Sequence, residues 1–268
     1  MSNQFIVAAV QMVSGDNVQT NIQVAAKLAQ QAKQQGAELI VLPEYFCHMG
    51  ADPLVKTLIA EDYGDGPIQQ ALSALAKNLG VWLIGGTLPI KSPSKDHIFN
   101  TQLVFSSDGE FTARYDKIHL FDFNDGQERF DESELVMAGH EPQTAHMPFG
   151  TVGLSTCYDL RFPELYRALG IVDLIVVPSA FTETTGRAHW ETLLRARAIE
   201  NQTYVLAAAQ GGVHPGLRRT WGHSMLIDPW GEIITTLELG EGVVVGEVNH
   251  ARLRSVRASL PALSNRVL

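Results

Sequence analysis

The sequence has few cysteines and no long apolar run. Its 268 residues include only Cys47 and Cys157, too few for a disulfide scaffold in a chain of this length. We therefore expect free thiols and a cytoplasmic location. No stretch reaches the roughly 18 apolar residues of a membrane span, and the N-terminus lacks the pattern of a secretory signal. We expect no membrane partner.

Positive charge is also scarce. Twenty Lys and Arg residues against 29 Asp and Glu give a formal net charge of −9 at pH 7. A nucleic-acid-binding protein needs a basic face that displaces the counterions of phosphate groups. The charge balance therefore argues against a nucleic-acid partner. An anionic small molecule stays compatible with it, provided that a local cluster of cations binds that molecule.

Metal-binding and redox patterns are missing too. The nine histidines are dispersed, with no His-x-His or HExxH spacing, and the Cys47-His48 pair has no further ligand nearby, so we interpret it as loop packing. The two cysteines lack the Cys-x-x-Cys spacing of a thiol–disulfide centre, which disfavours a redox role. We expect no metal and no cofactor.

What the sequence does contain is typical of an α/β protein. Hydrophobic residues make up 45% of the chain, enough for a sizeable core, and no linker-like stretch divides it, so we expect a single domain over residues 1–268. A strand at 6–12, an amphipathic helix from residue 18 to Gly36 and an apolar strand at 39–42 form a βαβ unit. Further helices are expected at 163–169 and 187–201. Further strands are expected at 81–88, 101–105, 111–115, 152–156, 174–177, 204–208, 224–227 and 243–248. This order predicts a layered α/β fold and leaves the number of layers open.

Two strand ends are similar to each other. AELIVLPEYF (37–46) and VDLIVVPSAF (172–181) place Glu44 and Ser179 at comparable positions. The similarity favours two halves built from related units. The alternative is that a strand followed by proline is simply common in α/β proteins.

Cys157 is the first candidate for chemistry. It ends an apolar strand, and Pro163 suits the first turn of the helix that follows. Such a turn exposes a side chain at the carboxyl edge of a sheet, where ligands bind in open α/β sheets. The positive end of the helix dipole would favour a thiolate. The alternative is a cysteine that only packs, since cysteine is among the most buried residue types.

Glu44 and Lys117 also follow predicted strands. A carboxylate at the edge of a buried strand can have a raised pKa and act as a general base, although a solvated loop carboxylate is the alternative for Glu44. Lys117 lies in YDKIHL (115–120) and could stabilise an oxyanion or a thiolate, although most lysines lie at the surface. Their separation along the chain gives no local test of geometry.

Three segments together carry a resemblance to a known family. LPEYF around Glu44, YDKIHLFD around Lys117 and STCYDLRFPE around Cys157 stand in the order typical of the nitrilase, or carbon–nitrogen hydrolase, superfamily, which the chain resembles over nearly its whole length. The resemblance implies a four-layer αββα sandwich, a Glu–Lys–Cys triad and a homodimer or larger homo-oligomer. The shorter segment FDES (130–133) resembles the part of the family that bears a second glutamate, here Glu132.

The resemblance also implies roles for these residues. Glu44 would take the proton of the Cys157 thiol and later activate water, while Lys117 and the backbone N–H after Cys157 would stabilise the oxyanion. Glu132 would orient Lys117 and the substrate nitrogen. A non-catalytic interaction protein of the same fold is the alternative from a different class, which the intact triad disfavours.

The second half resembles one branch of this superfamily. PSAFTETTGRAHWETLLRARAIENQTYVLAAAQ (178–210) and GHSMLIDPWGE (222–232) are similar to deaminated glutathione amidases, with the ω-amidases that act on α-ketoglutaramate and α-ketosuccinamate as the alternative. Either branch implies a small keto-acid amide with at least one carboxylate. The residues expected to contact it are Tyr158, Arg161, Ser179, Thr185 and Arg187, with Arg218 and Arg219 as further cations. For Arg161, pairing with Glu164 or Asp159 is the alternative, and Trp190 and Trp221 are expected to be core residues.

Overall fold

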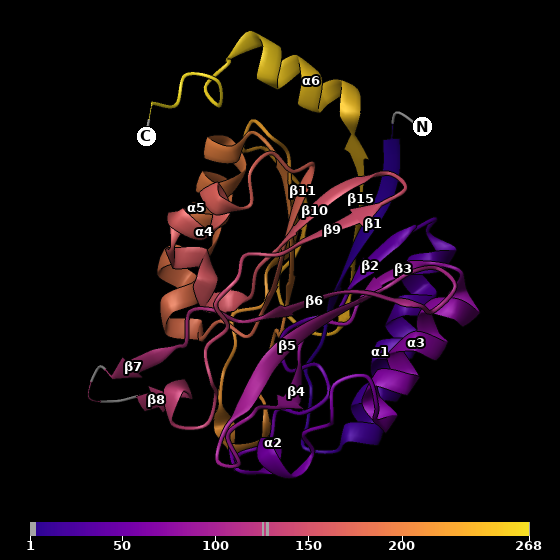
Figure 1. The fold of residues 1–268 in the computed structure, drawn as a ribbon, viewed down its shortest axis with the longest axis vertical. Helices are drawn as coiled ribbons and strands as arrows, with labels where there is room; N and C mark the ends of the chain where they lie inside the picture. Colours follow the sequence, from indigo (N-terminus) through magenta and orange to yellow (C-terminus); the bar gives the residue numbers. More distant parts are fainter. Residues whose placement is uncertain (1–3, 125, 127–128, 268) are drawn as a thin grey trace.

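Two β-sheets lie face to face, and helices cover their outer faces (Figure 1). The computed structural model describes residues 4–124, 126 and 129–267. Helices α1 (Val18–Gln34) and α3 (Pro67–Leu79) cover one sheet, and α4 (Pro163–Ala168) and α5 (Glu183–Asn201) cover the other. The expected four-layer αββα sandwich is confirmed.

The first sheet contains seven strands in the described part of the chain. Their order is β15-β1-β2-β3-β5-β4, with β6 paired to β5. Strands β1, β2 and β3 run parallel, and the other neighbours are antiparallel. The strands are β1 (Gln4–Gln11), β2 (Leu39–Val41), β3 (Trp82–Ile84), β4 (Leu88–Lys91), β5 (Ile98–Phe105), β6 (Phe111–Asp116) and β15 (Gly242–Asn249).

The second sheet contains six strands within the same described ranges, in the order β14-β13-β12-β11-β10-β9. Its central strands β10, β11 and β12 run parallel. The strands are β9 (Thr144–Met147), β10 (Gly150–Leu154), β11 (Leu174–Ser179), β12 (Tyr204–Ala209), β13 (Ser224–Ile227) and β14 (Ile233–Leu237). The remaining elements are α2 (Val55–Leu58), the pair β7 (Asp122–Asn124) and β8 (Arg129–Asp131), the 3-10 helices η1 (Glu132–Glu134), η2 (Cys157–Arg161) and η3 (Pro215–Leu217), and α6 (His250–Ser259).

The continuous apolar run of β2 follows from its place between two cores. Leu39 and Val41 point into the core between the two sheets. Ile40 points the other way, into the core between the first sheet and helices α1 and α3. Because side chains alternate along a strand, a strand buried on both faces needs apolar residues at every position. The same holds for β11, which is buried throughout.

Capping side chains fix where two helices begin. Asn17 accepts a hydrogen bond from the backbone N–H of Thr20 at 2.9 Å and begins α1. Thr182 accepts one from the N–H of Thr185 at 3.3 Å, so α5 begins at Glu183, four residues before the predicted start. Thr185 therefore belongs to the first turn of this helix.

The predicted strand at 81–88 is wrong as a single element. Strand β3 ends at Ile84, and β4 begins at Leu88. Gly86 lies between them with φ +58°, and a Cβ atom there would lie 2.1 Å from the carbonyl oxygen of Pro43. Only glycine allows this close approach in a left-handed conformation. The break brings the chain against the segment that carries Glu44.

Candidate active site

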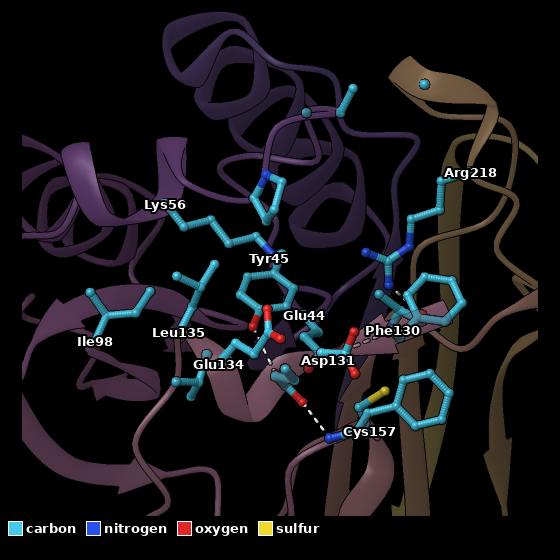
Figure 2. Close-up of a pocket in the computed structure, with 18 of the residues that line it drawn as sticks. Glu44, Tyr45, Lys56, Ile98, Phe130, Asp131, Glu134, Leu135, Cys157 and Arg218 are labelled. Carbon is cyan, nitrogen blue, oxygen red and sulfur yellow. Dashed lines mark hydrogen bonds between the residues drawn. The ribbon is translucent and has the colours of Figure 1, made fainter. Parts of the chain in front are cut away.

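The strand ends that carry Glu44, Lys117 and Cys157 meet at one edge of the sandwich. Glu44 follows β2 and Lys117 follows β6, both in the first sheet, while Cys157 follows β10 in the second. All three line one cavity of about 420 Å³, together with Glu132. Figure 2 shows this cavity, with Glu44 and Cys157 among its lining side chains. The structure thus brings the four predicted side chains to one place.

Lys117 lies between two carboxylates. Its Nζ is 3.0 Å from Oε1 of Glu44 and 2.7 Å from Oε2 of Glu132, and only 1% of the lysine side chain is exposed. Burial opposes the charge of the ammonium group, but the two carboxylates outweigh that effect and raise the pKa of Lys117. The lysine is therefore a permanent buried cation at neutral pH.

The two carboxylates are held by neutral donors as well. The amide of Asn100 donates to Glu44 at 3.0 Å and to Glu132 at 3.1 Å. Tyr45 donates its hydroxyl proton to Glu132 at 2.8 Å. Burial opposes the charge of Glu132, but Lys117 and hydrogen bonds from the backbone N–H of Phe121 and the hydroxyl of Tyr45 lower the pKa of Glu132. Glu132 is therefore ionised and fixed, as a group that orients Lys117 needs to be.

Glu44 also joins the two sheets. Its Oε2 accepts a hydrogen bond at 2.8 Å from the backbone N–H of Ala180, the residue directly after β11. The two strand ends that look alike in the sequence, β2 and β11, thus meet at this carboxylate.

Cys157 is held in a strained conformation on its turn. Its φ is +52°, in the left-handed region that non-glycine residues rarely occupy. Burial raises the pKa of the thiol, and the negative charge of Glu44 raises it further, against the opposing effect of Lys117. The direction of this shift favours the thiol over the thiolate, opposite to the effect expected from a helix dipole.

Asp159 connects the turn of Cys157 to the segment of Lys117. It accepts hydrogen bonds from the backbone N–H of Thr156 at 2.8 Å and from the hydroxyl of Tyr115 at 2.6 Å. It also binds the backbone N–H of His119 at 3.0 Å and its imidazole at 2.7 Å. These contacts fix the nucleophile relative to the chain that carries the lysine.

The site offers no obvious place for a metal ion. Across residues 4–124, 126 and 129–267, no group of three or more His, Cys, Asp or Glu side chains is arranged to hold one. The space between the carboxylates of Glu44 and Glu132 is taken by the ammonium group of Lys117.

Two of the expected substrate contacts lie next to the nucleophile. Tyr158 and Thr185 line a narrow space next to Cys157. Ser179 lies at the end of β11, fully buried, where its hydroxyl donates to the carbonyl oxygen of Val177 at 3.3 Å. Ser179 lines neither space.

Three of the four expected arginines lie elsewhere. Arg187 is on the exposed side of α5, paired with Glu183 at 2.7 Å. Arg161 contacts His189 at 3.2 Å and pairs with neither of the acids weighed for it, since Asp159 binds His119 instead. Arg219 also pairs with Glu183 at 3.4 Å. None of these three lines the cavity, contrary to expectation.

Residues that the sequence did not single out complete the site. Asn100 and Tyr45 hold the carboxylates, and Lys56 lines the cavity together with Arg218. Arg218, by contrast, is the one expected arginine that the structure places at the cavity. Lys56 lies in the short helix α2, in a stretch without any motif.

Comparison with known proteins gives one consistent family. The carbon-nitrogen hydrolase family model matches residues 6–258. A deaminated glutathione amidase of Yersinia enterocolitica is 42% identical over 266 residues, which is 97% of this chain and 92% of that protein. The human deaminated glutathione amidase is 38% identical over 97% of this chain and 82% of its own length.

Solved structures agree with this result. The Caenorhabditis elegans NitFhit protein has a TM-score of 0.90 and 39% identity over 98% of this chain, which spans 65% of that longer protein. Saccharomyces cerevisiae Nit3, a member of the nitrilase superfamily, has a TM-score of 0.88 and 30% identity over 100% of this chain and 98% of its own. Among the described residues no helix is long and apolar enough to span a membrane.

Proposed function

Because the chain belongs to the carbon–nitrogen hydrolase family and is an enzyme that hydrolyses an amide, we propose that its substrate is deaminated glutathione. The products are α-ketoglutarate and cysteinylglycine, formed through a thioester on Cys157. The relatives named above support this choice of substrate. The reaction is a repair step, because it returns two usable metabolites from a damaged one. We place it in the cytoplasm, in a single domain over residues 1–268.

The observation that carries the proposal is the buried lysine between two carboxylates, in the same cavity as the Cys157 thiol. Glu44 contacts Lys117 and lies close enough to Cys157 to raise the pKa of that thiol. One carboxylate is therefore placed to take the thiol proton, and one cation to hold the charge that develops on the carbonyl oxygen.

Acylation follows from this geometry. Glu44 takes the proton from Cys157 as the sulfur attacks the amide carbonyl carbon and forms the C–S bond. Lys117 and the backbone N–H of Tyr158, the residue after Cys157, stabilise the oxyanion. Glu44 then gives its proton to the leaving nitrogen as the C–N bond breaks. The amine departs, and the acyl group remains as a thioester.

Deacylation uses the same groups in reverse order. Glu44 takes a proton from water, the water oxygen attacks the thioester carbonyl carbon, and Lys117 again holds the oxyanion. The C–S bond breaks, and the sulfur of Cys157 regains the proton from Glu44. One carboxylate thus serves both half-reactions, and no external base is needed.

We propose that the enzyme is a homodimer or larger homo-oligomer. Apolar side chains are exposed where α5 lies next to the connection between β13 and β14: Ile199, Trp230 and Ile233. Arg195 of α5 donates to the carbonyl oxygen of Gly231 at 2.9 Å, which joins these segments into one surface. Exposed apolar surface of this kind marks contact sites. Light scattering on the purified protein tests the assembly, and a monomer mass contradicts it.

A direct assay tests the substrate. We expect purified protein to release cysteinylglycine from deaminated glutathione far faster than it releases ammonia from α-ketoglutaramate. The opposite preference makes it an ω-amidase. Intact-mass spectrometry after mixing with substrate should show an acyl group on Cys157. The Cys157→Ala variant should lose turnover, and full turnover in that variant contradicts the thioester mechanism.

A further inference from the structure

Two cations on the cavity wall have no role in the mechanism described above. Lys56 comes from α2 and Arg218 from the segment after η3, and both line the cavity that contains Cys157. Figure 2 shows their side chains reaching toward each other from opposite sides. Two positive groups that converge in a protein of net charge −9 need a physical reason.

Lys56 lies on an aromatic face. Its Nζ is 3.4 Å from the centre of the Tyr45 ring, and in the described residues it forms no ion pair with a carboxylate. Burial lowers the pKa of Lys56 to about 8, and the positive charge of Arg218 contributes to that shift. The two cations are thus close enough to repel each other, and the repulsion is relieved when an anion lies between them.

Arg218 is also without an acidic partner in the described part of the chain. Its guanidinium lies 5.2 Å from the centre of the Phe130 ring, and its Nη2 donates to the carbonyl oxygen of Ala180 at 3.5 Å. The buried Nε finds no acceptor among the described residues. A planar guanidinium with unused donors suits a carboxylate, which can accept two of its N–H groups.

The acidic residues at the cavity wall are already paired with Arg129 or Lys117. Asp131 lies 2.5 Å and Glu134 3.8 Å from nitrogen atoms of Arg129. Glu44 and Glu132 bind Lys117. Among the described residues, the charges of Lys56 and Arg218 are therefore left for a ligand.

The position of Lys56 relative to the catalytic groups fits a short acyl chain. The ring under Lys56 belongs to Tyr45, whose hydroxyl is 2.8 Å from Glu132, and Glu132 is 2.7 Å from Lys117. In an extended α-ketoglutaryl group the terminal carboxylate carbon lies about 5 Å from the carbonyl carbon that is attacked, four bonds away. Because Lys117 and Lys56 line the same cavity, a carbonyl held at Lys117 places this carboxylate in the space that Lys56 faces.

We propose that Lys56 and Arg218 form a subsite that binds the α-keto carboxylate of the acyl group, so that the enzyme selects amides whose acyl half is a short dicarboxylic acid. This inference rests on the proposed function. It differs from a subsite for the glycine carboxylate of deaminated glutathione, which leaves with the amine. The acyl carboxylate stays bound through both half-reactions.

Two substrates that share the acyl group and differ in the leaving group test the subsite. We expect Lys56→Met and Arg218→Met each to lower kcat/KM by about 10- to 100-fold on deaminated glutathione, and by the same factor on α-ketoglutaramate. Arg218→Lys should retain more activity than Arg218→Met. The matched control is Arg219→Gln, an exposed neighbour paired with Glu183, which should behave as wild type.

The outcomes are separate. A loss confined to deaminated glutathione assigns the cations to the leaving group and overturns the inference, as does no loss on either substrate. Wild-type protein that hydrolyses neither amide overturns the proposed function instead. Calorimetry with α-ketoglutarate needs no turnover: wild type should bind it, and each Met variant about 10- to 100-fold more weakly. Equal binding by all three, or none by wild type, also overturns the subsite.

Discussion

Replacement of Lys117 by methionine should destabilise the protein strongly, because it leaves two buried carboxylates without their cation. Methionine keeps the length of the side chain and removes its charge. Glu44 is 2% exposed and Glu132 11% exposed. Breaking a buried ion pair by removing one partner typically costs about 3–5 kcal/mol. We expect urea unfolding at pH 7 to show a loss of that size.

The matched control is Lys91→Met. Lys91 and Asp62 form an ion pair of 2.8 Å, similar in length to those of Lys117, but their side chains are 56% and 71% exposed. A surface pair contributes about 0–1 kcal/mol. If the two variants lose the same stability, burial does not control the strength of these ion pairs, and the reasoning is refuted.

The pH dependence of this loss has a definite sign. In wild type the raised pKa of Lys117 gives stability at every pH below its ordinary value of 10.5, and the lowered pKa of Glu132 gives stability above 4.5. In the methionine variant the buried carboxylates lose their cation, so the pKa of one of them rises in the folded state and it takes up a proton. The unfolded state lacks this shift, so the variant's deficit should shrink from pH 7 to pH 5. A deficit that grows on acidification contradicts the assignment.

Three further substitutions test the site. Glu44→Gln removes the negative charge that raises the pKa of Cys157, so iodoacetamide should alkylate this thiol at lower pH than in wild type. Hydrolysis should fall by at least about 100-fold. An unchanged pH profile of alkylation contradicts the effect of Glu44 on the Cys157 thiol. Asp159→Asn weakens the acceptor that binds four donors. We expect the free energy of unfolding in urea to fall by about 2–4 kcal/mol, and kcat to fall as well. An unchanged kcat would show that Asp159 does not position the site. Gly86→Ala should lower the free energy of thermal unfolding by at least about 2 kcal/mol more than Gly80→Ala. Both glycines have φ near +58°, but only at Gly86 would the new Cβ atom clash with a backbone oxygen. Equal losses would mean that the backbone conformation alone, and not this clash, causes the destabilisation.

Much of the fold could be predicted from apolar patterns. The apolar runs of β2 and β11 carry their signal in every residue, because both faces of each strand are buried. The prediction of one strand at 81–88 was wrong because its local sequence carries no signal of the break. Its glycines are compatible with a strand in sequence, and the contact of Gly86 with Pro43 that breaks the strand comes from a distant segment.

The site could be predicted only where residues belong to motifs. Glu44 and Cys157 follow strands and lie within recognisable segments. Asn100 lies inside β5, where an asparagine in a strand gives no sign that it binds two carboxylates. Arg187 was expected to contact the substrate as one of several cations near the pocket, whereas on α5 it is exposed and pairs with Glu183. Charge and proximity along the chain therefore do not say which arginine reaches a cavity.

The division of the catalytic groups between the two sheets has a consequence for the interior of the protein. Glu44 and Lys117 belong to one sheet and Cys157 to the other, so the distance between base and nucleophile depends on the spacing of the sheets. That spacing is set by side chains such as Val41 and Leu154, which fill the layer between them. Trimming a methyl group there can leave the architecture intact and still misalign the proton transfer. Selection on this layer therefore acts on reaction rate as well as on folding.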